Sequence, residues 1–189
     1  IVTGYTFCLF GVVNGDVTVK NLTFEDVQVV GAYYDTTGEN PKLVLAEIDS
    51  VGAAIGYAFG TGDLTLDNVK VLSGSIVGNQ AVGGIVGRFY NNGNTLIQNC
   101  DNYANISLTG EGAKHTGGIA GYGTRSGLND VEGKTPHTVI FKNNTNYGNV
   151  TGAATMAGAM VRYIGSPTNK IYVQFENCRN FGNITGSSV

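Results

Sequence analysis

One pattern occurs five times in this chain of 189 residues. A short glycine-rich or apolar run is followed by a strand-like segment, an asparagine and, a little later, a closing glycine. Self-similarity at a period of roughly 20 to 50 residues is typical of proteins in which equivalent units stack on one another. The runs are Phe7–Gly11, Ala53–Tyr57, Gly83–Gly87, Gly117–Gly121 and Ala157–Val161. The asparagines are Asn21, Asn68, Asn99, Asn143 and Asn177.

The segment before each asparagine alternates between two kinds of side chain. Val17 and Val19 fall on one face of the first segment, and Thr18 and Lys20 fall on the other. The other four units alternate in the same way, and no segment shows a helical period. Alternation with one apolar face is the signature of a half-buried β-strand.

Parallel stacking of equivalent strands places compatible residues side by side. The position before the asparagine reads Lys20, Asp67, Gln98, Lys142 and Glu176. Neighbouring units then place Lys20 beside Asp67 and Lys142 beside Glu176, with no like charges adjacent. The five asparagines form a ladder in which each amide bonds to the next unit. The sequence therefore predicts an all-β fold of stacked parallel strands.

The last three units share a second segment after the asparagine. It aligns Tyr103, Tyr147 and Phe181 as an aromatic column. It also aligns Asn105, Asn149 and Asn183 as a further amide column. Two interpretations of the aromatic column are open: a stack that fills the interior, which we favour, and an exposed platform for sugars.

The glycine-rich runs and the segment Asn-Cys-x-Asn-Tyr/Phe-x-Asn-Ile resemble the GLUG-type repeats of bacterial cell-surface proteins. Such repeats occur in adhesin-like proteins of gut Bacteroidetes and Firmicutes. The resemblance covers essentially the whole chain and is strongest from Gly83 onward, because the first two units lack the Asn-x-x-Asn-aromatic segment. It implies a right-handed parallel β-helix (a solenoid), exported and displayed outside the cell, with no catalytic motif.

We accordingly expect a single β-helix of about five rungs, with approximate boundaries 1–52, 53–82, 83–116, 117–156 and 157–189. The chain begins at Ile1 and shows no polar capping unit at either end. We therefore expect a fragment of a larger surface protein, with flanking domains in the same polypeptide.

Composition and cysteine spacing exclude some partners and cross-links. The formal net charge is −3, so the chain lacks the excess of basic residues that is typical of nucleic-acid-binding proteins. No apolar run approaches the roughly 18 residues that a membrane span needs. Cys100 and Cys178 share a column but lie two units apart, too far for a disulfide, so we expect buried single thiols.

Catalytic and metal-binding patterns do not emerge. The carboxylates are scattered rather than paired across a site, and His115 and His137 have no ligand at metal-binding spacing. Asp16 and Asp63 follow glycine in equivalent turns, where turn capping explains them better than calcium. We expect no enzyme activity, no metal and no cofactor. The alternative is a fragment of a carbohydrate-active β-helix enzyme, either a polysaccharide lyase or a glycosidase.

One candidate binding face stands out. The position after the glycine-rich run reads Val12, Ala58, Arg88, Tyr122 and Arg162. In register, Tyr122 would lie between two guanidinium groups, an arrangement that favours cation–π contact. Further residues available for ligand contact lie near this column or in the long insertions: Phe89, Tyr90, Tyr163, Tyr33, Tyr34 and Arg125. We hypothesise that Arg88, Tyr122 and Arg162 form a face that binds an acidic glycan. The alternative is that these stacked side chains only stabilise a structural scaffold.

The predicted function is a non-catalytic extracellular module of a bacterial surface protein, serving adhesion, ligand presentation or spacing. Its expected partner is a host or microbial glycan, or a host surface protein. The sequence does not choose between these partners.

Overall fold

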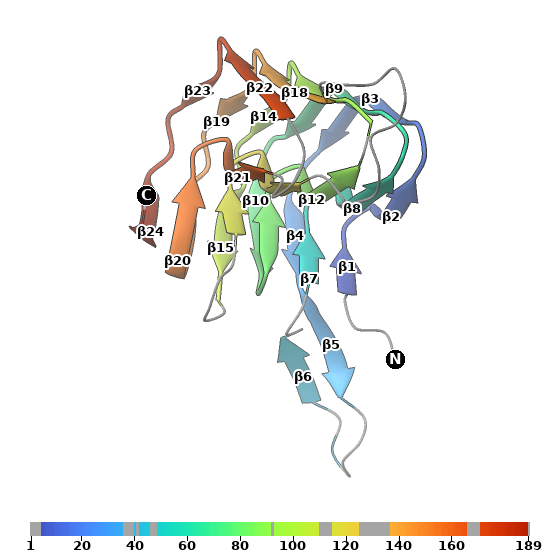
Figure 1. Ribbon diagram of the computed structural model, residues 1–189. Helices are drawn as coiled ribbons and strands as arrows, with labels where there is room; N and C mark the ends of the chain where they lie inside the picture. The colour runs from blue at the N-terminus through green and yellow to red at the C-terminus, as the bar shows by residue number, and fades with distance from the viewer. Residues whose placement is uncertain are drawn as a thin grey trace.

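The computed structural model describes residues 5–35, 40, 42–45, 49–91, 93–109, 115–124, 137–165 and 171–188. Throughout these residues the protein is all-β, without a helix, and its strands pair mostly in parallel (Figure 1). No described segment forms a helix long and apolar enough to cross a membrane.

Three parallel sheets make up most of the described structure. Sheet B has the order β2 (Phe10–Asn14), β8 (Ile55–Gly60), β12 (Val86–Asn91), β17 (Ala120–Thr124) and β21 (Val161–Gly165). The long strands of sheet C are β3 (Val17–Phe24), β9 (Leu64–Val71), β13 (Thr95–Gln98), β18 (His137–Lys142) and β22 (Ile171–Glu176). The short strands of sheet C are β14 (Asp101–Asn102), β19 (Thr145–Asn146) and β23 (Arg179–Asn180).

Sheet A contains two rows of strands. One row is β1 (Tyr5–Phe7), β7 (Asp49–Val51), β11 (Ala81–Gly83) and β16 (His115–Gly117). The other row is β4 (Val27–Val30), β10 (Gly74–Gly78), β15 (Asn105–Leu108) and β24 (Ile184–Ser188). The long strand β20 (Val150–Gly158) joins the rows, because its start pairs with β15 and its end pairs with β16. A separate antiparallel hairpin, β5 (Ala32–Asp35) and β6 (Lys42–Leu45), projects from the sheets (Figure 1).

The strand register confirms the parallel stacking of equivalent positions. Val19 pairs with Leu66, Leu66 pairs with Ile97, and the row continues through Phe141 to Phe175. In space, β2 and β3 lie at one end of the row of strands, whereas β23 and β24 lie at the other end (Figure 1). This arrangement is consistent with a β-helix.

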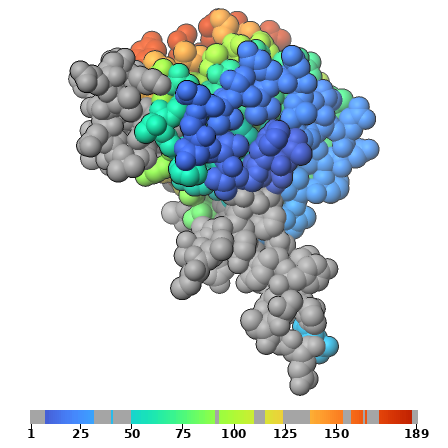
Figure 2. Space-filling model, turned by 90° about the vertical axis from the view of Figure 1, so that its right-hand side faces the viewer, coloured from blue at the N-terminus to red at the C-terminus, as the bar shows by residue number. Residues whose placement is uncertain are grey.

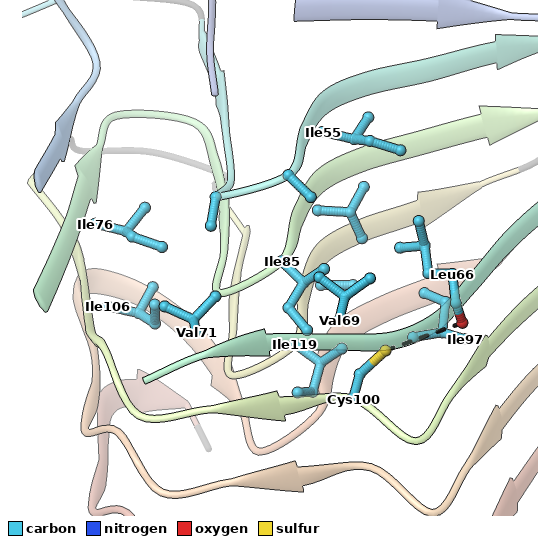
Figure 3. Close-up of a cluster of buried hydrophobic side chains, with 14 of the residues drawn as sticks. Ile55, Leu66, Val69, Val71, Ile76, Ile85, Ile97, Cys100, Ile106 and Ile119 are labelled. Carbon is cyan, nitrogen blue, oxygen red and sulfur yellow. Dashed lines mark hydrogen bonds between the residues drawn. The ribbon is translucent and has the colours of Figure 1, made fainter. Parts of the chain in front are cut away.

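The core lies between the sheets. Leu66, Ile97 and Phe141 of sheet C are fully buried. Ile55 and Ile85, at or just before the start of sheet B strands, join them in one cluster, part of which Figure 3 shows. Because each such side chain contributes about 1.5–3 kcal/mol on burial, these inward rows are a main source of stability.

The predicted asparagine ladder is present as side-chain hydrogen bonds. Its five asparagines adopt a left-handed backbone conformation, with φ between 51° and 55°. Asn68, Asn143 and Asn177 each donate from Nδ2 to Oδ1 of the preceding unit's asparagine, at 2.9, 3.1 and 3.3 Å. The ladder therefore has a direction, with each of these donors pointing toward the preceding unit.

One step of the ladder departs from the prediction. Asn99 donates to the Asp67 carboxylate at 2.8 Å rather than to Asn68, because an ionised acceptor binds an amide more strongly than a neutral one does. This hydrogen bond is the largest of the causes that lower the pKa of Asp67.

The aromatic column is stacked as predicted, but it does not fill the interior. The ring centroids of Tyr103 and Tyr147 are 4.1 Å apart, and those of Tyr147 and Phe181 are 5.2 Å apart. The three residues are 40–64% exposed. The preceding Asn102 and Asn146 are fully buried, and consecutive residues of an extended chain point to opposite faces, so the tyrosines point outward. The internal-stack interpretation is therefore wrong.

Two further amide columns accompany the aromatic stack. In the predicted one, the backbone N–H groups of Asn149 and Asn183 donate to Oδ1 of the asparagine in the preceding unit. The other column was not predicted and lies inside. Its buried members donate from Nδ2 of Asn102 to Asn146, and from Nδ2 of Asn146 to Asn180, both at 2.8 Å. The amides thus occupy the interior position that the prediction assigned to the rings.

Several smaller predictions are confirmed. All three cysteines are free thiols, and burial raises the pKa of Cys100 to about 12. Cys178 is only partly buried. Lys142 and Glu176 form an ion pair at 3.1 Å. The turn carboxylate of Asp16 differs from the predicted turn cap, because it accepts a hydrogen bond from a backbone N–H of the next unit, at Asp63.

Candidate functional site

The outward-facing column of sheet B differs from the predicted column at two positions. The register pairs Val12 with Tyr57, Tyr57 with Arg88, Arg88 with Tyr122 and Tyr122 with Tyr163. Ala58 and Arg162 therefore do not belong to the column. The predicted placement of Tyr122 between Arg88 and Arg162 is wrong.

A shift of one residue in two units caused this error. Strand pairing sets Gly117 level with Gly158, so the fifth run starts one residue later than predicted. In the second unit Ile55 pairs with Val86, so that run starts one residue earlier. A shift of one residue moves a strand's side chains to the opposite face, and Ala58 is accordingly only 3% exposed, in the core.

Arg88 is held between two tyrosine rings. Its guanidinium carbon lies 5.3 Å from the ring centroid of Tyr122 and 5.8 Å from that of Tyr57. Its Nη2 donates to Oε1 of Gln80 at 3.0 Å. Two cation–π contacts and one hydrogen bond hold the plane of the guanidinium in place.

No acidic side chain among the described residues neutralises Arg88. Its buried Nε has no hydrogen-bond partner there, and the bond to Gln80 uses only one of its donors. Ion pairs of the described residues lie elsewhere, between Lys70 and Asp101 and between Lys142 and Glu176. Arg88 is thus a positioned cation, and the Nη donors that Gln80 does not use suit an anion from outside, whereas the buried Nε does not reach one.

His115 borders the same site from the neighbouring sheet. Its ring centroid lies 4.1 Å from that of Tyr122. Burial, followed by the charges of Arg162 and Arg88, lowers the pKa of His115 to about 4. The imidazole is therefore neutral at pH 7. Arg162 lies outside the column, yet its charge still acts on His115 at the edge of the site.

Further aromatic rings extend the face along sheet B. Phe59 stacks on Tyr57 with a centroid distance of 5.5 Å, and Tyr90 pairs with Phe59 in the register. Burial raises the pKa of Tyr57, while the nearby Arg88 acts in the opposite direction. We call the set Tyr57, Phe59, Arg88, Tyr90 and Tyr122 the tyrosine–arginine face.

The structure brings together part of the predicted site. Arg88, Tyr90 and Tyr122 lie on the tyrosine–arginine face, and the backbone of Tyr163 continues the column. Arg125 lies outside the described residues, as does most of the insertion that carries it. Of the other insertion, the structure describes the backbone of Tyr33 and Tyr34 within β5.

Sequence reasoning missed Tyr57, Phe59, Gln80 and His115 as members of the site. Starting the second run at Gly52 would have recovered Tyr57, because Gly56 then aligns with Gly87 and Tyr57 with Arg88. No sequence signal marked His115 or Gln80. His115 approaches sheet B from β16 of sheet A, and Gln80 approaches it from the turn before β11.

The side chains of the face suit contact with an anion that carries an apolar part. Its guanidinium, phenol rings and neighbouring neutral imidazole offer contacts rather than a pair of carboxylates. Within the part of the chain that the structure describes, no group of three or more His, Cys, Asp or Glu side chains could hold a metal ion.

Comparison with known proteins assigns the chain to no family. No protein-family model matches the chain, and neither a curated protein nor a solved structure matches it.

Proposed function

We propose that the chain is a non-catalytic binding module that recognises an acidic glycan through the tyrosine–arginine face. The observation that carries the proposal is Arg88, held between Tyr57 and Tyr122 with no acidic partner among the described residues. A guanidinium held in this way loses little conformational entropy when it binds a carboxylate or sulfate.

The aromatic residues supply the second half of the recognition. Phe59 is 36% exposed, and Tyr57 and Tyr90 are half-buried. Aromatic rings at such a surface offer large apolar area with little side-chain entropy to lose. A sugar ring can lay its C–H face on this apolar area while its acidic group reaches Arg88.

The proposal extends to the overall architecture and location. The equivalent pairing of the units supports a parallel β-helix of about five rungs, and the resemblance to GLUG-type repeats implies that the helix is right-handed. A rigid coil of this kind would hold the face at a fixed geometry. With the GLUG-like repeat pattern, it supports a module of a bacterial cell-surface protein that serves adhesion or presents ligands.

Affinity electrophoresis of the full chain tests this function. Native gels would contain a uronate-bearing polysaccharide, a sulfated polysaccharide or a neutral one. We expect retardation in an acidic gel and none in the neutral gel. Arg88→Ala should weaken binding by about tenfold to a hundredfold, because a hydrogen bond to a charged group is worth about 1.5–3 kcal/mol.

Three further variants sharpen the result. Arg88→Lys keeps the charge but loses the planar fork, so it should bind more weakly than the natural chain but better than Arg88→Ala. Tyr57→Ala removes one ring that holds Arg88 and should also weaken binding. Lys70→Ala, on sheet C, is the matched control and should bind normally.

Two outcomes would count against the proposal. Equal retardation of Arg88→Ala and the natural chain would show that the tyrosine–arginine face is not the site. Release of shortened products from any polysaccharide, assayed as new reducing ends, would favour the alternative of a carbohydrate-active enzyme.

A further inference from the structure

Tyr103 and Tyr147 hold two phenol rings in direct contact at the surface. They occupy equivalent positions in the third and fourth units, directly after β14 and β19. Their ring centroids are 4.1 Å apart, and the ring planes differ by 8°. This separation is shorter than the roughly 4.5–7 Å that is usual for aromatic pairs. The two rings therefore lie face to face, with no room for another group between them.

The pair has neighbours on both sides within the stack of units. Figure 2 shows the order of the units, with the blue first unit facing the viewer and the orange and red last units behind it at the upper edge. The backbone N–H of Tyr103 donates to the carbonyl of Val71, which sets Leu72 level with Tyr103. On the other side, Phe181 stacks on Tyr147 with a centroid distance of 5.2 Å. Neither neighbour carries a phenol.

The two side chains point the same way, so that their hydroxyls lie together. The residues before them, Asn102 and Asn146, are fully buried and pair in register, which directs both tyrosines to the outer face. A hydrogen bond with Tyr147 is the largest of the causes that raise the pKa of Tyr103. Because the hydroxyls are neighbours and the rings are nearly parallel, each carbon ortho to a hydroxyl faces the corresponding carbon of the other ring.

Solvent reaches this pair along the ring edges. Tyr103 is 43% exposed and Tyr147 is 40% exposed. The ring faces cover one another, so the exposed portion consists of edges and hydroxyls. A platform for sugars needs free ring faces, whereas an oxidant that removes an electron from a phenol needs access only to its edge.

We propose that Tyr103 and Tyr147 form a site of oxidative cross-linking, at which a one-electron oxidant joins the two rings as dityrosine. The oxidant is of the haem peroxidase class, supplied with hydrogen peroxide. The link would connect the third unit to the fourth by a covalent bond. Because it closes a loop of the chain, it would restrict the unfolded state and stabilise the stack.

One molecule of hydrogen peroxide balances the reaction. Each phenol gives one electron to the oxidised peroxidase and its hydroxyl proton to water, which leaves two phenoxyl radicals. The radicals form one carbon–carbon bond between the facing ortho carbons. The two ortho C–H bonds then break, and protons return to the two phenol oxygens. The products are one dityrosine and two molecules of water.

The stack favours coupling within one chain over coupling between chains. The new bond between two phenoxyl rings forms perpendicular to their planes, which is the direction along which Tyr103 and Tyr147 already face one another. Holding two reactants in this arrangement removes the entropy cost of bringing them together. The exposed edges then allow the joined rings to tilt apart as the product becomes aromatic again.

Treatment of the full chain at low concentration with a haem peroxidase and hydrogen peroxide is the first test. We expect the blue fluorescence of dityrosine in a band that stays monomeric on a denaturing gel. The intact mass should fall by two hydrogen atoms, and peptide mapping should identify the Tyr103–Tyr147 link. Fluorescence in dimers alone, or links that all join other tyrosines, would overturn the proposal.

Conservative variants identify the residues that react. Tyr103→Phe and Tyr147→Phe each keep a ring in the column, where Phe181 already stands, but remove a phenol. Each should lose the fluorescent monomer. Tyr172→Phe is the matched control, because Tyr172 is 57% exposed and no described ring stacks on it. It should react as the natural chain does. Loss of the product in Tyr172→Phe but not in Tyr103→Phe would show that exposure rather than stacking decides the reaction.

Unfolding tests whether the fold aligns the rings. A photochemical one-electron oxidant that works in urea replaces the peroxidase in this experiment. The yield of fluorescent monomer should fall by about tenfold or more above the unfolding midpoint, because the rings are no longer held together. An equal yield from folded and unfolded chains would overturn the proposal. The result is independent of glycan binding, since the tyrosine–arginine face lies on sheet B.

Discussion

His115 shows how tertiary neighbours set the chemistry of a single residue. In the sequence it is an isolated histidine between lysine and threonine. In the fold it lies against Tyr122, and burial with two nearby arginine charges lowers its pKa to about 4. Folding therefore favours the neutral imidazole, which links stability to pH.

The direction in which stability changes with pH can be measured. The unfolded chain takes up a proton on His115 near pH 6.5, whereas the folded chain does so only near pH 4. The stabilising contribution is present above pH 6.5 and is lost as the pH falls toward 4. At about 1.4 kcal/mol per pH unit the full effect would be about 3 kcal/mol; solvent screening of this half-buried group reduces it to about 1–2 kcal/mol.

The measurement is urea unfolding of the natural chain and of His115→Gln at pH 7 and pH 4.5. The natural chain should lose more stability than the variant between these pH values. His137 is present in both proteins, so its titration cancels in the comparison. An equal loss in the two proteins would show that His115 is not held neutral by the fold.

Among the structural elements, the asparagine corners of the last three units each join two strands of sheet C, whereas Asn21 and Asn68 lie within β3 and β9. Asn143 follows β18 and precedes β19, with φ of 53°. Its amide donates to Asn99 and accepts from Asn177. The corner thus combines a backbone conformation that asparagine tolerates with a link to both neighbouring units.

Two substitutions at this corner separate the two contributions. Both Asn143→Gly and Asn143→Ala lose the ladder hydrogen bonds, each worth about 0.5–1.5 kcal/mol. Alanine must also adopt the left-handed conformation, at about 1–2 kcal/mol. We therefore expect Asn143→Ala to have the lower urea midpoint of the two.

The adjacent Lys142 in β18 is the matched control. There the backbone is an ordinary strand, so glycine should be the more destabilising substitution and the order should reverse. The same order at both positions would contradict the proposed role of the left-handed corner.

Across the molecule as a whole, burial is greatest in the middle of the row of strands. Leu66, Ile97 and Phe141 are fully buried, whereas Phe175 in the last strand of the same row is half exposed. In a stack of units, each unit is stabilised mainly by its neighbours, so the end units have fewer stabilising contacts. Stability should accordingly fall from the middle toward both ends.

Native-state hydrogen exchange would reveal this gradient. We expect the slowest amide exchange at Ile97 and its neighbours in β13, and the fastest in β3 and β22. Uniform protection along the row would mean that the units unfold as one cooperative block.

Features that follow from the local period of the chain were predictable before folding was considered. Alternation identified the inward residues of sheet C, and the repeat identified the positions that pair, because both follow from the geometry of an extended chain. The same logic found the asparagine ladder and the stack of Tyr103, Tyr147 and Phe181, since equivalent residues of parallel units must lie side by side.

Features that depend on a one-residue register, or on contacts between sheets, required the folded molecule. Packing placed Tyr57 rather than Ala58 beside Arg88, and it brought His115 of sheet A against Tyr122 of sheet B. The Tyr103 column turned outward because buried amides take the inward positions beside it. A repeat pattern orders positions along the chain, whereas the start of each strand and the angle between sheets are set by how the side chains pack.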